Sequence, residues 1–176
     1  MIAADTLPLD SHLNAYRRPI DFMDVYSGDL SARPDLLACD IRALGGHFTT
    51  IDMAWAQKLL KLRDQVVRPF GLKTTKDLAK DAVEKQVSEL QAGDRIQFFK
   101  IYEIREDEIL LGEDDWHQDF RLSIFRRKGP SPRVYVSTCC QRHNIFGHAY
   151  LAAILPFHKM LVKQSLENGL KRPLAG

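Results

Sequence analysis

The chain has 176 residues, with 25 Lys and Arg against 23 Asp and Glu and a formal net charge of +2. Hydrophobic residues make up 45% of it and charged residues 27%, which excludes a disordered or fibrous chain. One domain of this length can bury about two thirds of the surface that its unfolded chain exposes. The small net charge predicts no nucleic-acid partner.

The three cysteines, Cys39, Cys139 and Cys140, have neither the number nor the spacing of a disulfide framework or a CxxC metal pair. They predict a reducing compartment, with no metal and no cofactor. The start of the chain lacks the basic and apolar run of a signal peptide, and the longest uncharged apolar stretch, 149–157, is about half of a membrane span. We therefore expect a cytoplasmic protein with no membrane span.

The first part of the chain predicts short elements. Residues 1–15 show no periodicity, so we expect a flexible tail there. A short strand is expected over 20–26, where apolar residues mix with acidic ones. A short helix is expected over 34–43, and Gly45 and Gly46 would end it as a C-terminal cap.

A clearer helix follows, for which Asp52 is a suitable N-cap. Its apolar residues recur at spacings of three and four and are Trp55, Leu59, Leu62, Val66 and Phe70. The polar residues left for water are Lys58, Lys61, Arg63 and Asp64. The segment 73–91 is polar and weakly periodic, and we expect it to be a mobile connection with room for one helical stretch.

From residue 95 the period of the apolar residues becomes that of strands. Turn signals at REDE, GEDD and KGPSP divide the region into RIQFFKIYEI, DEILLG, WHQDFRLSIFRR and RVYVSTCCQ. Consecutive strands with such short links must be antiparallel, because a parallel link needs a crossover of about a dozen residues. The sequence therefore predicts a four-stranded antiparallel meander.

A long terminal helix comes next, with Asn144 as its cap and an end near Asn168, where Gly169 can stop it. Pro156 predicts a bend in this helix. Gly147 predicts the close approach of another backbone, because glycine costs about 1 kcal/mol of helix propensity there without making a turn. The broad apolar face predicted to lie on the sheet consists of Phe146, Tyr150, Ala153, Ile154, Phe157 and Leu161.

One polar cluster lies in the third strand of the meander. Alternation places His117, Asp119 and Arg121 on one face, which is material for acid–base chemistry: an imidazole, a carboxylate to orient it and a cation to steady an anion. If Phe120 and Leu122 point at the terminal helix, this row faces outward and is an ion-paired surface. If a bulge reverses the register, the row enters the space beneath the helix.

The stretches WAQKLLKLRDQVVRPFGLK, GEDDWHQDFRLSI and HNIFGHAYLAAILPFHKMLVKQSL resemble the bacterial family catalogued as domain of unknown function 2867, over most of residues 16–168. That family resembles the START-like (SRPBCC) helix-grip superfamily. The resemblance implies an α+β helix-grip fold of the START/Bet v 1-like kind, with a curved antiparallel sheet around a long C-terminal helix and a cavity between them. It implies a single domain over 16–170, with flexible tails over 1–15 and 171–176.

Members of this superfamily mostly bind apolar ligands, and some are enzymes. We therefore expect a small hydrophobic molecule as the partner, with Tyr150 or His158 as its polar anchor. Two alternatives stay open: an enzyme of the same fold that uses His117, Asp119 and Arg121, and a protein-interaction or dimerisation domain, which leaves a homodimer open. The residues expected to line the cavity are Phe99, Ile101, Phe120, Tyr150, Ile154, Phe157 and His158.

Overall fold

The computed structural model of the chain describes residues 2–68, 71, 74, 75, 77 and 85–174. Within these residues the strands form one sheet in which every neighbouring pair is antiparallel. The seven strands are β1 (Ile2–Ala4), β2 (Phe22–Asp29), β3 (Arg95–Ile96), β4 (Phe99–Ile104), β5 (Glu108–Asp114), β6 (Gln118–Arg127) and β7 (Arg133–Arg142). Their order across the sheet is β1-β2-β7-β6-β5-β4-β3.

The strands of the second half of the chain follow one another across the sheet, which confirms the predicted antiparallel meander. The first predicted segment is divided into β3 and β4 by a turn in which Gln97 has a φ of 58°. The predicted early strand is β2, which pairs with β7 from Phe22↔Cys140 to Asp29↔Arg133. The first long strand therefore lies beside the last one.

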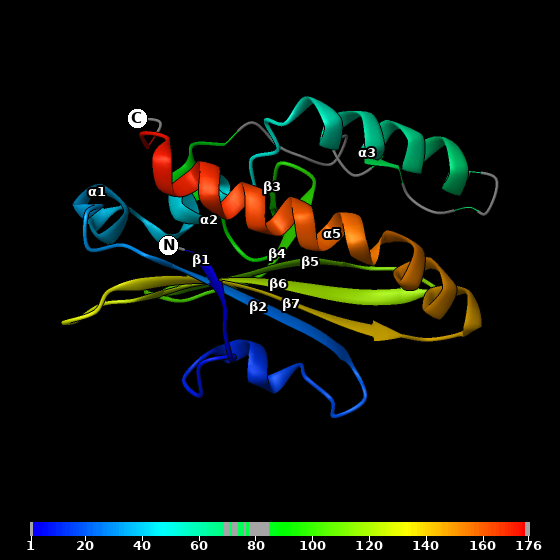
Figure 1. Cartoon of the computed structure of the whole chain (residues 1–176), viewed down its shortest axis with the longest axis horizontal. Coiled ribbons are helices and arrows are strands. Elements are labelled where there is room, and N and C mark those ends of the chain that lie inside the picture. The colour runs from blue at the N-terminus through cyan, green and yellow to red at the C-terminus, as the bar shows by residue number, and fades with distance from the viewer. Residues whose placement is uncertain (1, 69–70, 72–73, 76, 78–84, 175–176) are drawn as a thin grey trace.

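The helices are α1 (Pro34–Ala38), α2 (Ile41–Thr49), α3 (Ala54–Val67) and α5 (Ile145–Lys171), with 3-10 turns η1 (His12–Ala15) and η3 (Val87–Glu89). Figure 1 shows α5, α3 and α2 on one face of the sheet and η1 on the opposite face. The fold is thus α+β, with an antiparallel sheet and a long C-terminal helix. The main apolar core lies between the sheet and the helices, and its members include Leu44, Phe48, Ile109, Ile124, Val136 and Leu166.

The ends of α5 show which glycine predictions hold. Asn144 caps the helix as predicted, since its side chain accepts a hydrogen bond from the backbone N–H of Gly147. Gly169 does not end the helix, which runs on to Lys171. A Cβ at Gly169 would lie 2.6 Å from the ring of Phe48, so this glycine permits close packing instead.

The single helix predicted over 34–43 is two helices. It breaks at Asp40, whose side chain accepts a hydrogen bond from the backbone N–H of Arg42 and so begins α2. Gly45 and Gly46 therefore lie inside α2 and do not cap the first helix. Gly45 packs against the sheet, because a Cβ there would lie 3.0 Å from Cγ2 of Ile109.

The helix α3 is present as predicted, but Asp52 does not cap it. The N-cap is Met53, and Asp52 instead accepts hydrogen bonds from Arg172 at 3.0 Å and from Asn168 at 3.2 Å. These bonds tie the start of α3 to the end of α5. Arg172 therefore has a fixed partner, although the sequence placed it in a flexible tail.

Part of the predicted apolar stripe of α3 falls outside what the structure describes. Phe70 lies outside the described residues, and so does the side chain of Val66. Leu62 is 54% exposed and so is not part of the buried face. Residues 73, 76 and 78–84 of the segment 73–91 also lie outside the described residues, and η3 is the regular element in its described end.

The start of the chain differs most from its prediction. Residues 2–4 form β1, which pairs with β2, and Leu13 in η1 is completely buried. This segment covers the second face of the sheet, where Leu110 and Cys139 form a small apolar cluster with Leu13. A local pattern does not reveal such an element, because its order comes from the sheet that it covers.

By length and composition alone, α5 could cross a membrane. This is weak evidence for a membrane span, because a helix that packs on a sheet meets the same criteria. Leu151, Val162 and Leu166 of α5 are buried, but only 11% of its apolar 18-residue stretch is buried.

Candidate functional site

A cavity of about 250 Å³ lies between α5 and the sheet. Phe120, Leu122 and Val136 form part of its floor, and Leu151, Ile154 and Leu161 of α5 lie across from them. Engineered apolar cavities of about 150 Å³ already bind benzene, so this one has room for a small molecule.

The lining residues expected from the sequence divide into two groups. Phe99, Phe120, Tyr150, Ile154 and His158 line the cavity. The other two, Ile101 and Phe157, lie elsewhere.

Ile101 is completely buried in the main core beside the cavity. Phe157 is 48% exposed. At about 100° per residue, the lining side chains of α5 cover an arc of about 120° that starts at Tyr150, and Phe157 lies about 20° outside its edge. The apolar face of α5 predicted from the sequence therefore lies partly on the solvent side of the face that lines the cavity.

His117 occupies one end of the cavity. Its side chain is 3% exposed and lies among the rings of Trp116, Phe146 and Tyr150, with 4.9 Å between its ring centroid and that of Tyr150. Neither ring nitrogen has a hydrogen-bond partner among the described residues, and the carboxylate of Asp115 lies 3.8 Å from Nδ1. Burial lowers the pKa of His117, so its imidazole is neutral at neutral pH.

The three candidate catalytic residues are not together. Asp119 lies 3.0 Å from Nε2 of His143 at the end of the sheet. Arg121 is on the opposite face, where it pairs with Asp114 at 2.6 Å and lies 3.5 Å from the ring centroid of Tyr102. His117 faces the cavity because it belongs to the turn before β6, so strand alternation does not apply to it.

Arg63 of α3 is a cavity residue that the sequence assigned to solvent. Its Nε donates to the hydroxyl of Tyr150 at 3.0 Å, and its Nη1 donates to Asp64 at 2.9 Å. A signal was available, since Arg63 continues the four-residue spacing of Trp55 and Leu59. An arginine on an apolar stripe indicates a buried polar contact.

The second predicted anchor, His158, also lines the cavity. Its Nε2 lies 3.1 Å from Oδ2 of Asp24 on β2. Two further buried lining groups, Oε1 of Gln118 and Oγ1 of Thr138, have no hydrogen-bond partner in the described part of the chain. The sequence analysis did not single out either of them.

The cysteines offer no activated nucleophile. Burial raises the pKa of Cys139 to about 11 and that of Cys140, which lines the cavity, to about 12. Both are therefore thiols rather than thiolates at neutral pH. Over the described residues no cluster of His, Cys, Asp and Glu could hold a metal ion.

The fold and the cavity define an α+β protein in which a C-terminal helix and an antiparallel sheet enclose a mostly apolar space. The chain belongs to the family described as protein of unknown function (DUF2867), whose model matches residues 17–165. This confirms the family resemblance seen in the sequence. No curated protein and no solved structure gives a significant match to the chain.

Acidification is expected to destabilise the protein, because its buried neutral histidines resist protonation. Burial holds the pKa of His117 and of His47 below the ordinary value of about 6.5. The unfolded chain takes up these protons first, so this contribution is complete above about pH 6.5 and is lost as pH falls through the native pKa values. Thermal unfolding between about pH 5 and pH 8 measures the slope.

The variant His117→Phe isolates one of these groups. It keeps an aromatic ring among Trp116, Phe146 and Tyr150 but cannot titrate. Its melting temperature should fall less steeply than that of the parent below about pH 6.5. A slope equal to that of the parent would contradict the neutral, buried state of His117.

Proposed function

We propose that the protein binds a small, mostly apolar molecule in the cavity between α5 and the sheet. The observation that carries this proposal is a cavity of about 250 Å³ in which aromatic and aliphatic walls surround buried polar groups that lack partners. Small-molecule sites have this composition: largely apolar walls with a few polar groups that fix orientation. Buried polar groups otherwise find partners inside a protein.

A helix-grip assignment is part of the proposal. The strand order supports it, because β2 lies beside β7 and the meander then continues outward to β3. The position of α5 along the face of such a sheet supports it too (Figure 1). In the START-like superfamily, which this chain resembles, ligands occupy the space between these two elements.

The geometry favours binding over catalysis by the residues first considered. Asp119 cannot orient His117, since it pairs with His143 instead. Arg121 lies across the sheet from the cavity, against Tyr102. The polar groups that remain in the cavity, such as Arg63 and Tyr150, suit the anchoring of a ligand.

Titration with N-phenylnaphthylamine, an uncharged apolar fluorophore, tests the proposal. We expect saturable binding of one probe per chain. Ile154 lies on the cavity wall, so Ile154→Trp should fill the space and weaken binding at least about tenfold, or about 1.4 kcal/mol. Circular dichroism and melting curves of each variant establish that it is folded.

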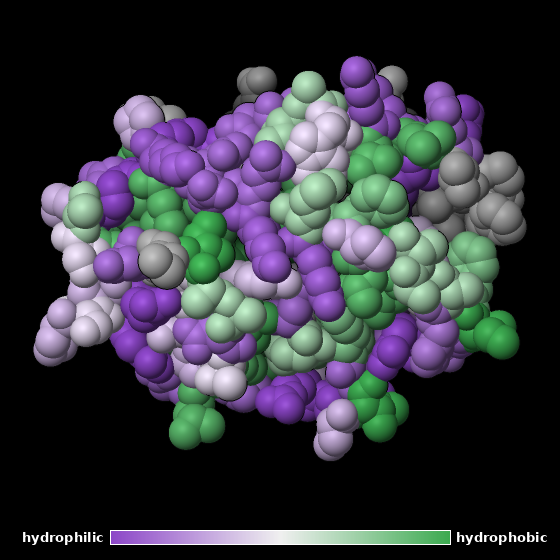
Figure 2. All heavy atoms as spheres, viewed as in Figure 1, coloured by the Kyte–Doolittle hydropathy of each residue, from purple (hydrophilic) through white to green (hydrophobic). Residues whose placement is uncertain are grey.

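A matched control replaces exposed apolar residues on the same helix. Figure 2 shows apolar side chains gathered over the first half of α5. Phe157 and Met160 are each 48% exposed, so Phe157→Gln with Met160→Gln should leave probe binding unchanged. The proposal is wrong if the parent binds no probe, or if this surface variant loses binding while Ile154→Trp keeps it.

A further inference from the structure

We infer that the ligand is elongated and uncharged, with a hydroxyl or carbonyl group at each end and an apolar middle. This inference rests on the proposed function and adds the chemical class of the ligand. It comes from the way polar side chains divide between two ends of the cavity. The cavity polar groups used here are Arg63, His117, Gln118, Thr138, Tyr150 and His158.

The first polar end is built around His117. Its two ring nitrogens and the Oε1 of Gln118 have no partner among the residues described, and both side chains are buried. The hydroxyl of Tyr150 accepts a hydrogen bond from Arg63, so its own proton is directed elsewhere. Together these groups offer donors and acceptors to a hydroxyl or carbonyl oxygen.

The second polar end is built around Thr138 of β7. Thr138 is 4% exposed, and its hydroxyl has no hydrogen-bond partner in the described structure. Asp24 lies opposite it in the β2–β7 register, and His158 reaches Asp24 from α5 at 3.1 Å. A ligand hydroxyl here could donate to one of these groups and accept from another.

The helix and the sheet give the same separation between the two ends. Tyr150 and His158 are eight residues apart on α5, which is about 12 Å along the axis. On the sheet, Thr138 pairs with Leu122, which is four residues from Gln118 on β6, or about 13 Å. Between the two ends the cavity wall is mostly apolar, as Phe120 and Ile154 show, and Glu113, opposite Phe120, is paired with Arg95 at 2.8 Å.

The charges that face the cavity argue against an ionised ligand. Asp24, paired with His158, lies beside the second end but is not among the residues that line the cavity. At the first end Asp115 lines the cavity, and Arg63 is the cation there, already bonded to Asp64 and Tyr150. A carboxylate at the first end would therefore meet the fixed carboxylate of Asp115, and one at the second end would lie close to Asp24, which is unfavourable in both cases.

Competition against bound N-phenylnaphthylamine tests this inference. The competitors are straight-chain α,ω-diols of increasing length, with the primary alcohol and the α,ω-dicarboxylate of each length for comparison. Affinity should peak at the diol whose oxygens lie about 12 Å apart. The alcohol of that length should bind about tenfold more weakly, since one end of the cavity keeps its unpaired groups, and the dicarboxylate should bind more weakly still.

Two neighbouring variants locate the second end. Thr138→Val removes the cavity hydroxyl, so it should abolish the advantage of the diol over the alcohol. Ser137→Ala is the control, because Ser137 is also buried without a partner in the described chain but points to the other face of β7. Ser137→Ala should bind the probe as the parent does. For Thr138→Val the affinities of the diol and the alcohol are compared within the same variant, so that any change in apolar binding affects both equally.

The outcomes separate the inference from the proposed function. If the probe binds but the diols show no optimum length, or if Thr138→Val and Ser137→Ala behave alike, the two-ended ligand is wrong and the apolar site stands. If the probe does not bind the parent, both the two-ended ligand and the proposed function are wrong.

Discussion

Replacing Gly147 with alanine is expected to lower the free energy of unfolding by roughly 2–3 kcal/mol. Gly147 is in the first turn of α5, and a Cβ there would lie 2.1 Å from the carbonyl oxygen of His117. That oxygen belongs to the backbone and accepts a hydrogen bond from the N–H of His143 at 3.0 Å, so it cannot move aside freely. The start of α5 must shift instead.

The variant Gly46→Ala is the matched control, because it makes the same change inside another helix. The nearest atom to a Cβ at Gly46 is Cγ2 of Ile96 at 3.7 Å, an ordinary contact. Alanine should therefore add about 0.5–1 kcal/mol of stability through helix propensity. Urea unfolding measures both values, and opposite signs are the expected result.

Ligand binding gives a second measurement of the same substitution. His117 forms one end of the cavity, and the start of α5, which must shift away from the carbonyl of His117, carries Tyr150 on the cavity wall. Gly147→Ala should therefore weaken probe binding in the folded fraction, whereas Gly46→Ala should not. Equal stability and equal binding in the two variants would show that α5 adapts to the added methyl group.

The sheet and the terminal helix could be predicted because their signals are local. Strand alternation, short turns and the cap at Asn144 each depend on a few neighbouring residues, and each is found in the structure. The role of Gly147 was also predictable, since a glycine inside a helix without a turn needs a packing reason.

Other glycine signals were misread because termination and close packing look alike in a sequence. Gly45 and Gly169 resemble helix caps, yet each lies inside a helix where a side chain would collide with another element. The colliding partners, Ile109 and Phe48, are distant in the chain. A helix end can be distinguished from such a contact only when the partner is known.

The candidate site was predicted in part for the same reason. The apolar wall residues follow from periodicity, so most of them were found. His117, Asp119 and Arg121 do not share one face, because β6 begins at Gln118 and His117 lies before it. The prediction depended on that boundary, and strand ends are set by tertiary contacts. Thr138 gave no signal, because a threonine in a strand is ordinary unless its hydroxyl lacks a partner.

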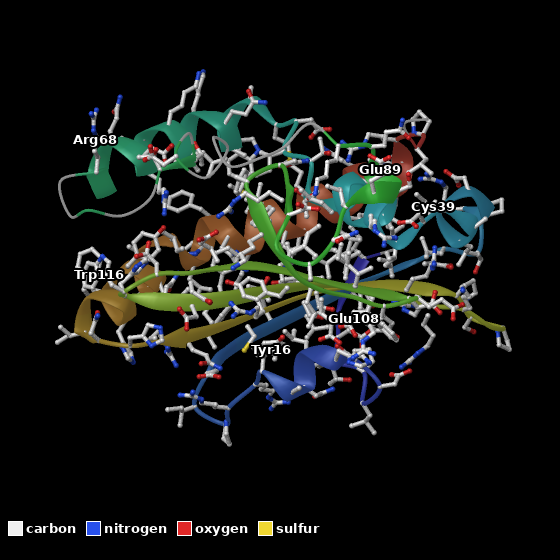
Figure 3. The ribbon with its side chains drawn as sticks, turned by 180° about the vertical axis from the view of Figure 1, so that it is seen from behind. Tyr16, Cys39, Arg68, Glu89, Glu108 and Trp116 are labelled. Carbon is white, nitrogen blue, oxygen red and sulfur yellow. The ribbon has the colours of Figure 1, made fainter. Side chains whose placement is uncertain are left out.

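The start of the chain gives the clearest case of order that is not local, and it depends on Glu108. This residue of β5 is 2% exposed and lies on the side of the sheet that the N-terminal segment covers, as the labelled Glu108 and Tyr16 show in Figure 3. Its Oε1 accepts hydrogen bonds from the hydroxyls of Ser11 at 2.7 Å and Ser123 at 2.5 Å. Its Oε2 accepts one from the backbone N–H of His12 at 2.6 Å.

Glu108→Ala is therefore expected to lower the free energy of unfolding by about 3 kcal/mol, the largest loss expected of any substitution considered. It leaves the buried hydroxyls of Ser11 and Ser123 and the N–H of His12 without their acceptor. Glu106→Ala is the control, because the side chain of Glu106 is 86% exposed and its pair with Lys128 is a surface contact worth less than about 1 kcal/mol.

Urea unfolding and limited proteolysis together test where that loss acts. If the carboxylate holds the N-terminal segment in place, Glu108→Ala should be cut within residues 2–15 at protease concentrations that leave the parent and Glu106→Ala intact. Equal stability with unchanged cleavage would show that packing of Leu13 alone orders the segment. Loss of stability without early cleavage would instead place the role of Glu108 in the sheet, through Ser123.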